Sequence, residues 1–113
     1  MLFVFLSFIF SFQSGDYKDY SDNQLKMELT EYYYEIEEKV GQFDENDDEL
    51  KRYLQVTLAI LTEMERRGNL ASEATEGVSS FKKSWDKKGL KKEAIVSFME
   101  IIAPYTLSIA KSR

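Results

Sequence analysis

The sequence predicts an all-α protein, either a four-helix bundle or two packed antiparallel helical hairpins, behind a short hydrophobic N-terminal segment. Hydrophobic residues recur at spacings of three and four along four stretches between residues 21 and 111. A glycine follows each of the first three stretches, at Gly41, Gly68 and Gly89, where helices commonly end. One proline and five glycines are too few for an all-β chain with many tight turns. With 113 residues, we expect residues 1–15 as the hydrophobic segment and 16–113 as a single helical domain.

The chain opens with a run of 12 residues that are all apolar except Ser7 and Ser11. As a helix this run would span about 18 Å, short of the roughly 30 Å hydrocarbon core of a membrane. It has the length of a signal-peptide core, but no Lys or Arg precedes it and the Gln13-Ser14-Gly15 sequence is a poor cleavage site. A signal or membrane tether, a segment packed on the helical domain, and an unstructured start all stay open. The sequence leaves the location unknown: cytoplasmic, or membrane-associated or secreted if residues 1–15 act as a signal or tether.

The first helix should begin at Ser21 and end at Gly41. Ser21 and Gln24 have the spacing of a capping box. The buried stripe is predicted to contain Leu25, Leu29, Tyr32, Tyr33, Ile36 and Val40. Because few residues connect it to the next helix, the two should form an antiparallel hairpin.

The second helix is predicted between Asn46 and Gly68, with Asn46 as the N-cap and Glu49 completing the capping box. Its wide apolar face holds Leu50, Tyr53, Leu54, Thr57, Ile60, Leu61 and Met64. The side expected to face solvent holds Lys51, Arg52, Gln55, Ala59, Thr62 and Arg66.

The third helix should run from about Ser72 to Lys87. Ala74, Val78, Phe81 and Trp85 recur at helical spacing, which places Trp85 in the core. Gly77 lies inside this stretch and should cost about 1 kcal/mol relative to alanine.

The fourth helix should start near Lys91. Its polar positions form one narrow stripe that includes Pro104, so we expect a helix that bends at Pro104 rather than one that stops at Ala103. Residues 94–110 contain a single charge, Glu100. A charge at the centre of a membrane span is costly, so the pattern favours a bundle helix over a membrane span.

The composition excludes several kinds of site. The chain has no cysteine and no histidine, which removes disulfides, thiolate chemistry, His-based catalytic triads and zinc sites with His or Cys ligands. Residues 44–49 resemble a calcium loop, but Glu49 stands where glycine is needed and Gln55 where glutamate is needed, which favours a charged helix start. The clustered Glu35, Glu37 and Glu38 read as a solvated face. We therefore expect a non-enzymatic protein without a metal or cofactor.

Charge is unevenly divided along the chain. Residues 16–49 hold 13 acids and 3 bases, whereas residues 50–113 hold 7 acids and 12 bases. Either the acidic and basic helices compensate each other within one bundle, or the protein presents two polar surfaces to different partners.

The leading functional hypothesis is protein binding through an acidic, tyrosine-containing face of the first helix. This face would contain Met27, Glu31, Tyr34 and Glu38, at spacings of four, three and four. The same residues could instead pack on the N-terminal segment or on the fourth helix. A small accessory protein, an inhibitor or an immunity-type protein would fit this surface, as would an inhibitor that mimics DNA.

A second hypothesis places an anion-binding surface at the turn between the third and fourth helices. Lysines surround Trp85 and Gly89 there, at Lys82, Lys83, Lys87, Lys88, Lys91 and Lys92. These residues could contact nucleic acid or an anionic membrane, or they could form a solvated basic turn. Self-association of the chain also stays open.

Overall fold

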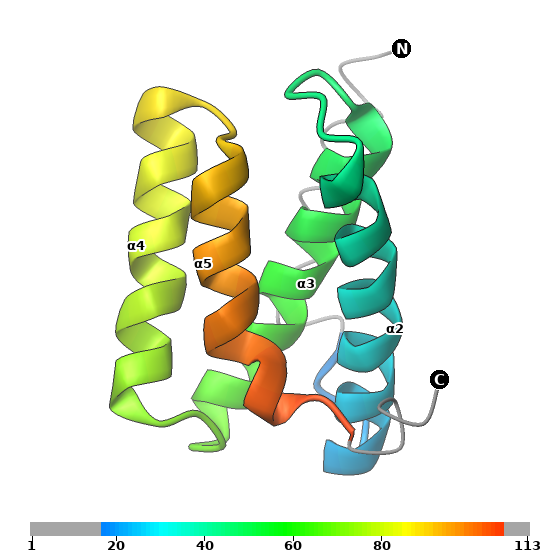
Figure 1. Cartoon of the computed structure of the whole chain (residues 1–113). Helices are drawn as coiled ribbons and strands as arrows, with labels where there is room; N and C mark the ends of the chain where they lie inside the picture. The colour runs from blue at the N-terminus through cyan, green and yellow to red at the C-terminus, as the bar shows by residue number, and fades with distance from the viewer. Residues whose placement is uncertain (1–16, 108–113) are drawn as a thin grey trace, which may run out of the picture.

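The computed structural model of the protein describes residues 17–107. It contains the helices α2 (Asp22–Gly41), α3 (Asp48–Arg66), α4 (Ser72–Lys88) and α5 (Lys92–Ile102), followed by the short 3-10 turn η2 (Ala103–Tyr105). Helices α2 and α3 form one packed pair and α4 and α5 a second pair (Figure 1). The predicted all-α fold of two packed helical hairpins is confirmed. The predictions for residues 1–15 lie outside the described residues.

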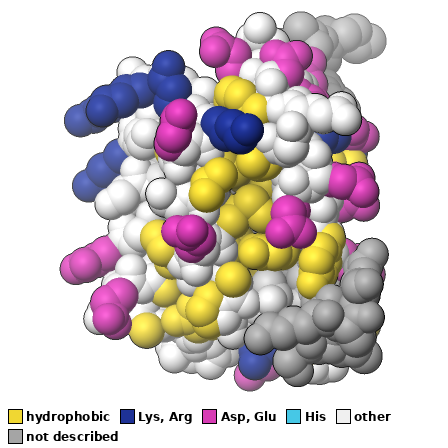
Figure 2. All heavy atoms as spheres, viewed as in Figure 1, with side chains coloured by type: hydrophobic (Ala, Val, Ile, Leu, Met, Phe, Trp, Pro, Cys, Tyr) yellow, Lys and Arg dark blue, Asp and Glu magenta, His cyan; other side chains and the backbone are white. Residues whose placement is uncertain are grey.

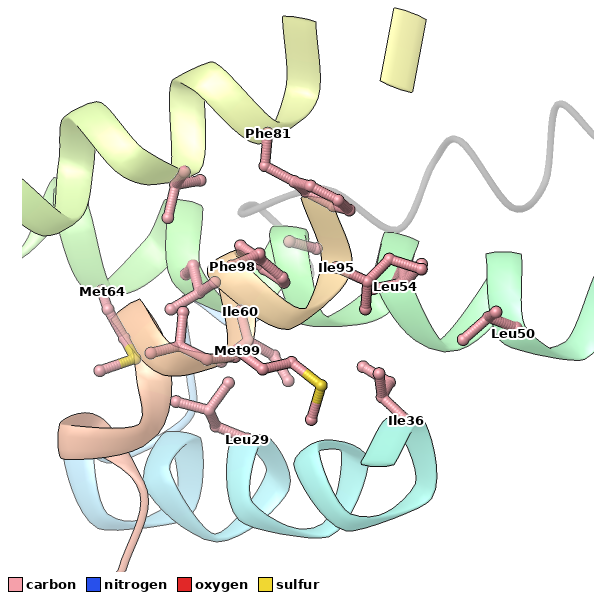
Figure 3. Close-up of a cluster of buried hydrophobic side chains, with 14 of the residues drawn as sticks. Leu29, Ile36, Leu50, Leu54, Ile60, Met64, Phe81, Ile95, Phe98 and Met99 are labelled. Atoms are coloured by element: carbon pink, nitrogen blue, oxygen red, sulfur yellow. The ribbon is translucent and has the colours of Figure 1, made fainter. Parts of the chain in front are cut away.

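The core receives side chains from all four helices, as Figure 3 shows. Each side chain at its centre is at most 6% exposed; among these are Leu29, Ile36, Leu54, Ile60, Phe81, Ile95, Phe98 and Met99. Every helix therefore has one face fixed by apolar burial, and only the opposite faces are free for function.

The predicted start of α2 is confirmed. The backbone N–H of Gln24 donates to Ser21 Oγ at 3.0 Å, and the backbone N–H of Ser21 donates to Gln24 Oε1 at 2.8 Å. This reciprocal capping box satisfies two backbone donors that a helix start leaves unpaired. On the predicted buried stripe, Tyr32 and Tyr33 are half-buried rather than buried.

The predicted N-cap of α3 is wrong by one residue. Asp47, not Asn46, caps the helix: its carboxylate accepts the backbone N–H groups of Glu49 at 3.0 Å and Leu50 at 3.2 Å. The N–H of Asn46 instead donates to Asp44 Oδ1 at 2.9 Å. A turn from Asp44 to Asp47 precedes the helix and shifts its start forward.

The predicted end of α3 at Gly68 is confirmed. Gly68 has φ +78°, and its N–H donates to the carbonyl of Glu65 while the N–H of Asn69 donates to that of Met64. This pair of hydrogen bonds is a Schellman motif, which needs a left-handed residue at the position that Gly68 occupies.

The side of α3 predicted to face solvent is narrower than expected. Ala59 is only 6% exposed, and Lys51, Gln55 and Thr62 are half-buried. Because α3 packs against both α2 and α4, it is covered over most of its circumference.

A buried carboxylate fixes the end of α3. Glu63 is fully buried and accepts charge-assisted hydrogen bonds from Arg66 and Arg67. Arg67 also donates to Asp22 Oδ1 at 2.8 Å and to the carbonyl of Tyr17 at 3.1 Å, which joins the end of α3 to the start of α2. These two guanidinium groups hold the pKa of Glu63 at about 2, well below its usual range.

Gly77 lies where α4 approaches α5. A Cβ atom at this position would lie 2.5 Å from the Cδ1 atom of Ile101. One turn further along α4, the Phe81 ring stacks on Phe98 with centroids 4.3 Å apart. Close packing against α5 therefore explains a glycine that is unfavourable for helix formation.

The expectation of a bent helix through Pro104 is wrong. Helix α5 ends at Ile102, η2 follows, and Thr106 is extended. Proline has no backbone N–H to donate to the preceding turn, and here the helix stops instead of bending. After the turn, the backbone N–H of Leu107 donates to Thr30 Oγ1 on α2 at 2.8 Å.

Within residues 17–107, no helix is long and apolar enough to cross a membrane. Helix α5 is only 11 residues long and ends at Ile102, within the apolar stretch of residues 94–110.

Candidate functional site

The four residues predicted for protein binding lie along the outer face of α2. Met27 is 48% exposed, Glu31 and Glu38 are exposed, and Tyr34 is half-buried. The Tyr34 ring packs edge-on against Tyr33, with centroids 5.6 Å apart. The side chains of this group thus reach the surface of the described structure; we call it the α2 face.

The α2 face continues toward α3 through residues that the sequence analysis did not select. Glu31 lines a pocket of about 250 Å³ together with Glu28, Tyr32, Glu35 and Tyr53. The rings of Tyr32 and Tyr53 lie 5.7 Å apart. Tyr53 belongs to α3, so helical spacing along α2 could not have identified it.

Carboxylates are crowded on this side of α2. Burial and the neighbouring Glu31 raise the pKa of Glu28 above its ordinary value. Burial and the Glu28 carboxylate raise the pKa of the Tyr32 phenol. Burial is the larger cause of both pKa shifts, and the smaller contribution of the neighbouring carboxylates reflects the negative charge on this side of α2.

The glutamates of α2 have no cationic partner in the part of the chain that the structure describes. The salt bridges among residues 17–107 use Lys39, Arg52, Arg66 and Arg67 as cations. None of them involves Glu28, Glu31, Glu35, Glu37 or Glu38. Within residues 17–107, basic side chains therefore do not compensate these glutamates through salt bridges.

A strip of hydrophobic side chains runs along the face where α5 and α2 meet, with acidic side chains beside it (Figure 2). Val96 of α5 is 39% exposed. Burial raises the pKa of Tyr33, and the nearby carboxylates of Glu37 and Glu100 raise it further, so carboxylates from both helices lie near this ring. On the side that meets α5, α2 therefore also combines apolar surface with negative charge.

The six lysines of the second hypothesis are all exposed. Lys87, Lys88, Lys91 and Lys92 flank the α4–α5 turn at Gly89, where basic side chains project from the surface in Figure 2. Lys82 and Lys83 lie earlier in α4, more than one helical turn before Gly89. In the described structure no lysine of this group takes part in a salt bridge.

Lys82 and Lys83 line a cleft between α3 and α4 that we call the Trp85 cleft. Its volume is about 580 Å³. It is lined by Lys51, Gln55, Leu58, Lys82, Lys83, Trp85 and Asp86. The placement of Trp85 in the core is correct only in part, because Trp85 packs against Phe81 at 6.0 Å but is half-buried and also faces the cleft.

No cluster of residues suited to a metal ion occurs between residues 17 and 107. In the stretch that resembles a calcium loop, the carboxylates of Asp44 and Asp47 accept backbone N–H groups at the start of α3. Comparisons of the chain with protein-family models, curated proteins and solved structures found no match.

Proposed function

We propose that this protein is a small, non-enzymatic accessory or inhibitor protein that binds another protein through the α2 face. The observation that carries the proposal is the set of α2 glutamates that form no salt bridge within residues 17–107, beside the exposed Met27 side chain. The partner surface is expected to be basic, with a hydrophobic residue or recess at its centre.

The apolar residues of the α2 face would supply most of the binding energy. Methionine adapts its shape to a partner, and its burial removes apolar surface from water. Tyrosine presents a large, rigid ring at a small cost in conformational entropy and is common among the residues that dominate interfaces. The Tyr34 ring is already positioned against Tyr33, so little ordering would be needed on binding.

The glutamates would act mainly on the rate and specificity of association. Glu31 and Glu38 are exposed and flank Tyr34 along the helix. Carboxylates at the edge of an interface attract a basic partner and disfavour an acidic one, but each contributes little to affinity once it is screened. Binding should therefore weaken moderately as salt concentration rises.

The test is a pull-down from the native host, with membrane and soluble fractions kept separate, using wild-type protein and the double variant Met27→Ala/Tyr34→Ala. A protein captured by the wild type should bind the variant at least about 30-fold more weakly, as expected for the loss of about 2 kcal/mol at an interface centre. Far-UV circular dichroism should show unchanged helicity, because neither side chain is fully buried.

The matched control is Lys87→Ala/Lys88→Ala at the α4–α5 turn, which should bind like the wild type. Equal capture by the wild type and by the Met27/Tyr34 variant would refute the α2 face as the binding surface. A competition experiment with DNA tests the DNA-mimicking form of the proposal. If DNA displaces this protein from the captured protein, that form is supported; if DNA does not displace it, that form is excluded.

A further inference from the structure

We propose that the Trp85 cleft binds a small aromatic anion, meaning a flat ring system that carries a carboxylate, sulfonate or phosphate group. The cleft lies between α3 and α4 and shares no residue with the α2 face. The proposal therefore does not depend on the proposed protein-binding function.

The packing of α4 explains why a cleft is present. Gly77 lets α4 approach α5 closely, and Phe81 of α4 stacks on Phe98 of α5. Helix α4 is thus held against α5, and its contact with α3 is much less extensive. The remaining space, about 580 Å³, falls within the roughly 300–1,000 Å³ range of small-molecule sites.

The cleft offers apolar surface for a ring. Leu58 of α3 and Trp85 of α4 both line it, and both are half-buried. The Trp85 ring packs against the Phe81 ring, with centroids 6.0 Å apart and an interplanar angle of 46°. A flat aromatic ligand could stack in an offset arrangement on the indole while removing its own apolar surface from water.

The polar groups of the cleft select an anion. Lys51 on the α3 side and Lys82 and Lys83 on the α4 side contribute three positive charges, against the single negative charge of Asp86. None of these lysines is in a salt bridge within residues 17–107. The Gln55 side-chain amide adds a hydrogen-bond donor. An anionic group bound between the two walls would be contacted from both helices.

The experiment compares two probes that differ in charge. 1-Anilinonaphthalene-8-sulfonate is an aromatic anion, and N-phenyl-1-naphthylamine has the same ring system without the sulfonate. Trp85 is the only tryptophan of the chain, so energy transfer from Trp85 to a bound naphthalene reports binding to the protein, and the cleft and turn variants then locate the site. Titrations use the full chain at low and at physiological salt.

We expect one saturable site for the anionic probe, quenching of Trp85 fluorescence, and an affinity roughly tenfold above that of the neutral probe, since each screened ammonium contributes modestly. The variant Lys51→Gln/Lys82→Gln/Lys83→Gln should lose this roughly tenfold preference while still binding the neutral probe. The control Lys87→Gln/Lys88→Gln/Lys91→Gln, at the turn outside the cleft, should keep it.

Three outcomes would overturn the proposal. The first is equal affinity for the two probes, and the second is an anionic preference that survives in the cleft variant. The third is that a single-stranded oligonucleotide binds more tightly than the anionic probe, and that the turn variant and the cleft variant weaken this binding equally. That result would indicate an extended nucleic-acid surface in place of a small-ligand site.

Discussion

The close approach of α4 to α5 predicts an unusual response to the substitution Gly77→Ala. In an isolated helix, alanine is more favourable than glycine by about 1 kcal/mol. In the protein, the new Cβ atom would lie 2.5 Å from Cδ1, 3.3 Å from Cγ2 and 3.4 Å from Cγ1 of Ile101. The helix and the packing between helices therefore impose opposite preferences at one position.

The packing penalty should exceed the gain in helix propensity. Carbon atoms in contact prefer a separation of about 3.5–4.0 Å, so the end of the Ile101 side chain would have to move by about 1 Å. Rotation about χ2 can move Cδ1, but the positions of Cγ2 and Cγ1 depend on χ1, which is restricted for isoleucine within a helix. Overpacking of this kind costs about 1–3 kcal/mol. The free energy of unfolding should fall by about 1 kcal/mol, which lowers Tm by roughly 4–8 °C.

A double-mutant cycle with Ile101→Val isolates the contact, because valine lacks the Cδ1 atom that lies closest to the new methyl group. In the valine background, Gly77→Ala should be neutral or should stabilise by up to about 1 kcal/mol. The expected coupling free energy is therefore about 1 kcal/mol or more, measured by urea denaturation.

An exposed position of α4 supplies the matched control. Ser80 is exposed, so comparison of Ser80→Gly with Ser80→Ala measures helix propensity without a packing term. If Gly77→Ala stabilised the wild-type protein, or had the same effect in both Ile101 backgrounds, close packing against Ile101 would not be the reason for this glycine.

Two further predictions concern the ends of α3. Asp47→Ala should lower the free energy of unfolding by about 1 kcal/mol, because the Asp47 carboxylate caps the helix. Asn46→Ala should lower it by less than about 0.5 kcal/mol. Equal losses for the two variants, measured by chemical denaturation, would contradict the assignment of Asp47 as the N-cap. The depressed pKa of Glu63 means that its ion pairs with Arg66 and Arg67 stabilise the fold above pH 4.5 and that this stability is lost as pH falls toward 2. Glu63→Gln should flatten the pH dependence of the free energy of unfolding in that window, as measured by urea denaturation at several pH values; an unchanged slope would show that other groups cause it.

Two surfaces of opposite charge on one small domain have a consequence for function. The glutamates lie on α2 and the lysines of the Trp85 cleft on α3 and α4, and no salt bridge in residues 17–107 joins them. The two proposed ligands, a basic protein and a small aromatic anion, would therefore bind at separate sites. The variants proposed for each surface leave the other surface intact, so the two proposals can be tested independently.

The sequence alone located the four helices and most of their ends, because helix boundaries depend on short-range chemistry; the end of α5 at Ile102, before Pro104, was predicted wrongly. Ser21 with Gln24 located one helix start, and Gly68 located one helix end. The one-residue error at Asn46 has the same local origin, since several side chains in that acidic run can accept a backbone N–H group, and only the turn from Asp44 to Asp47 selected among them.

The tertiary structure decided everything that depends on residues from different helices. Apolar periodicity placed Trp85 in the core, but only the packing of α4 against α5 left its other side open to a cleft with Lys51 and Leu58. Likewise, the sequence listed the charges, whereas the fold paired Glu63 with two arginines and left the glutamates of α2 without a partner within residues 17–107. The physical reason is the same in each case: helix formation depends on neighbours within about four residues, whereas sites and ion pairs depend on distances that only chain packing sets.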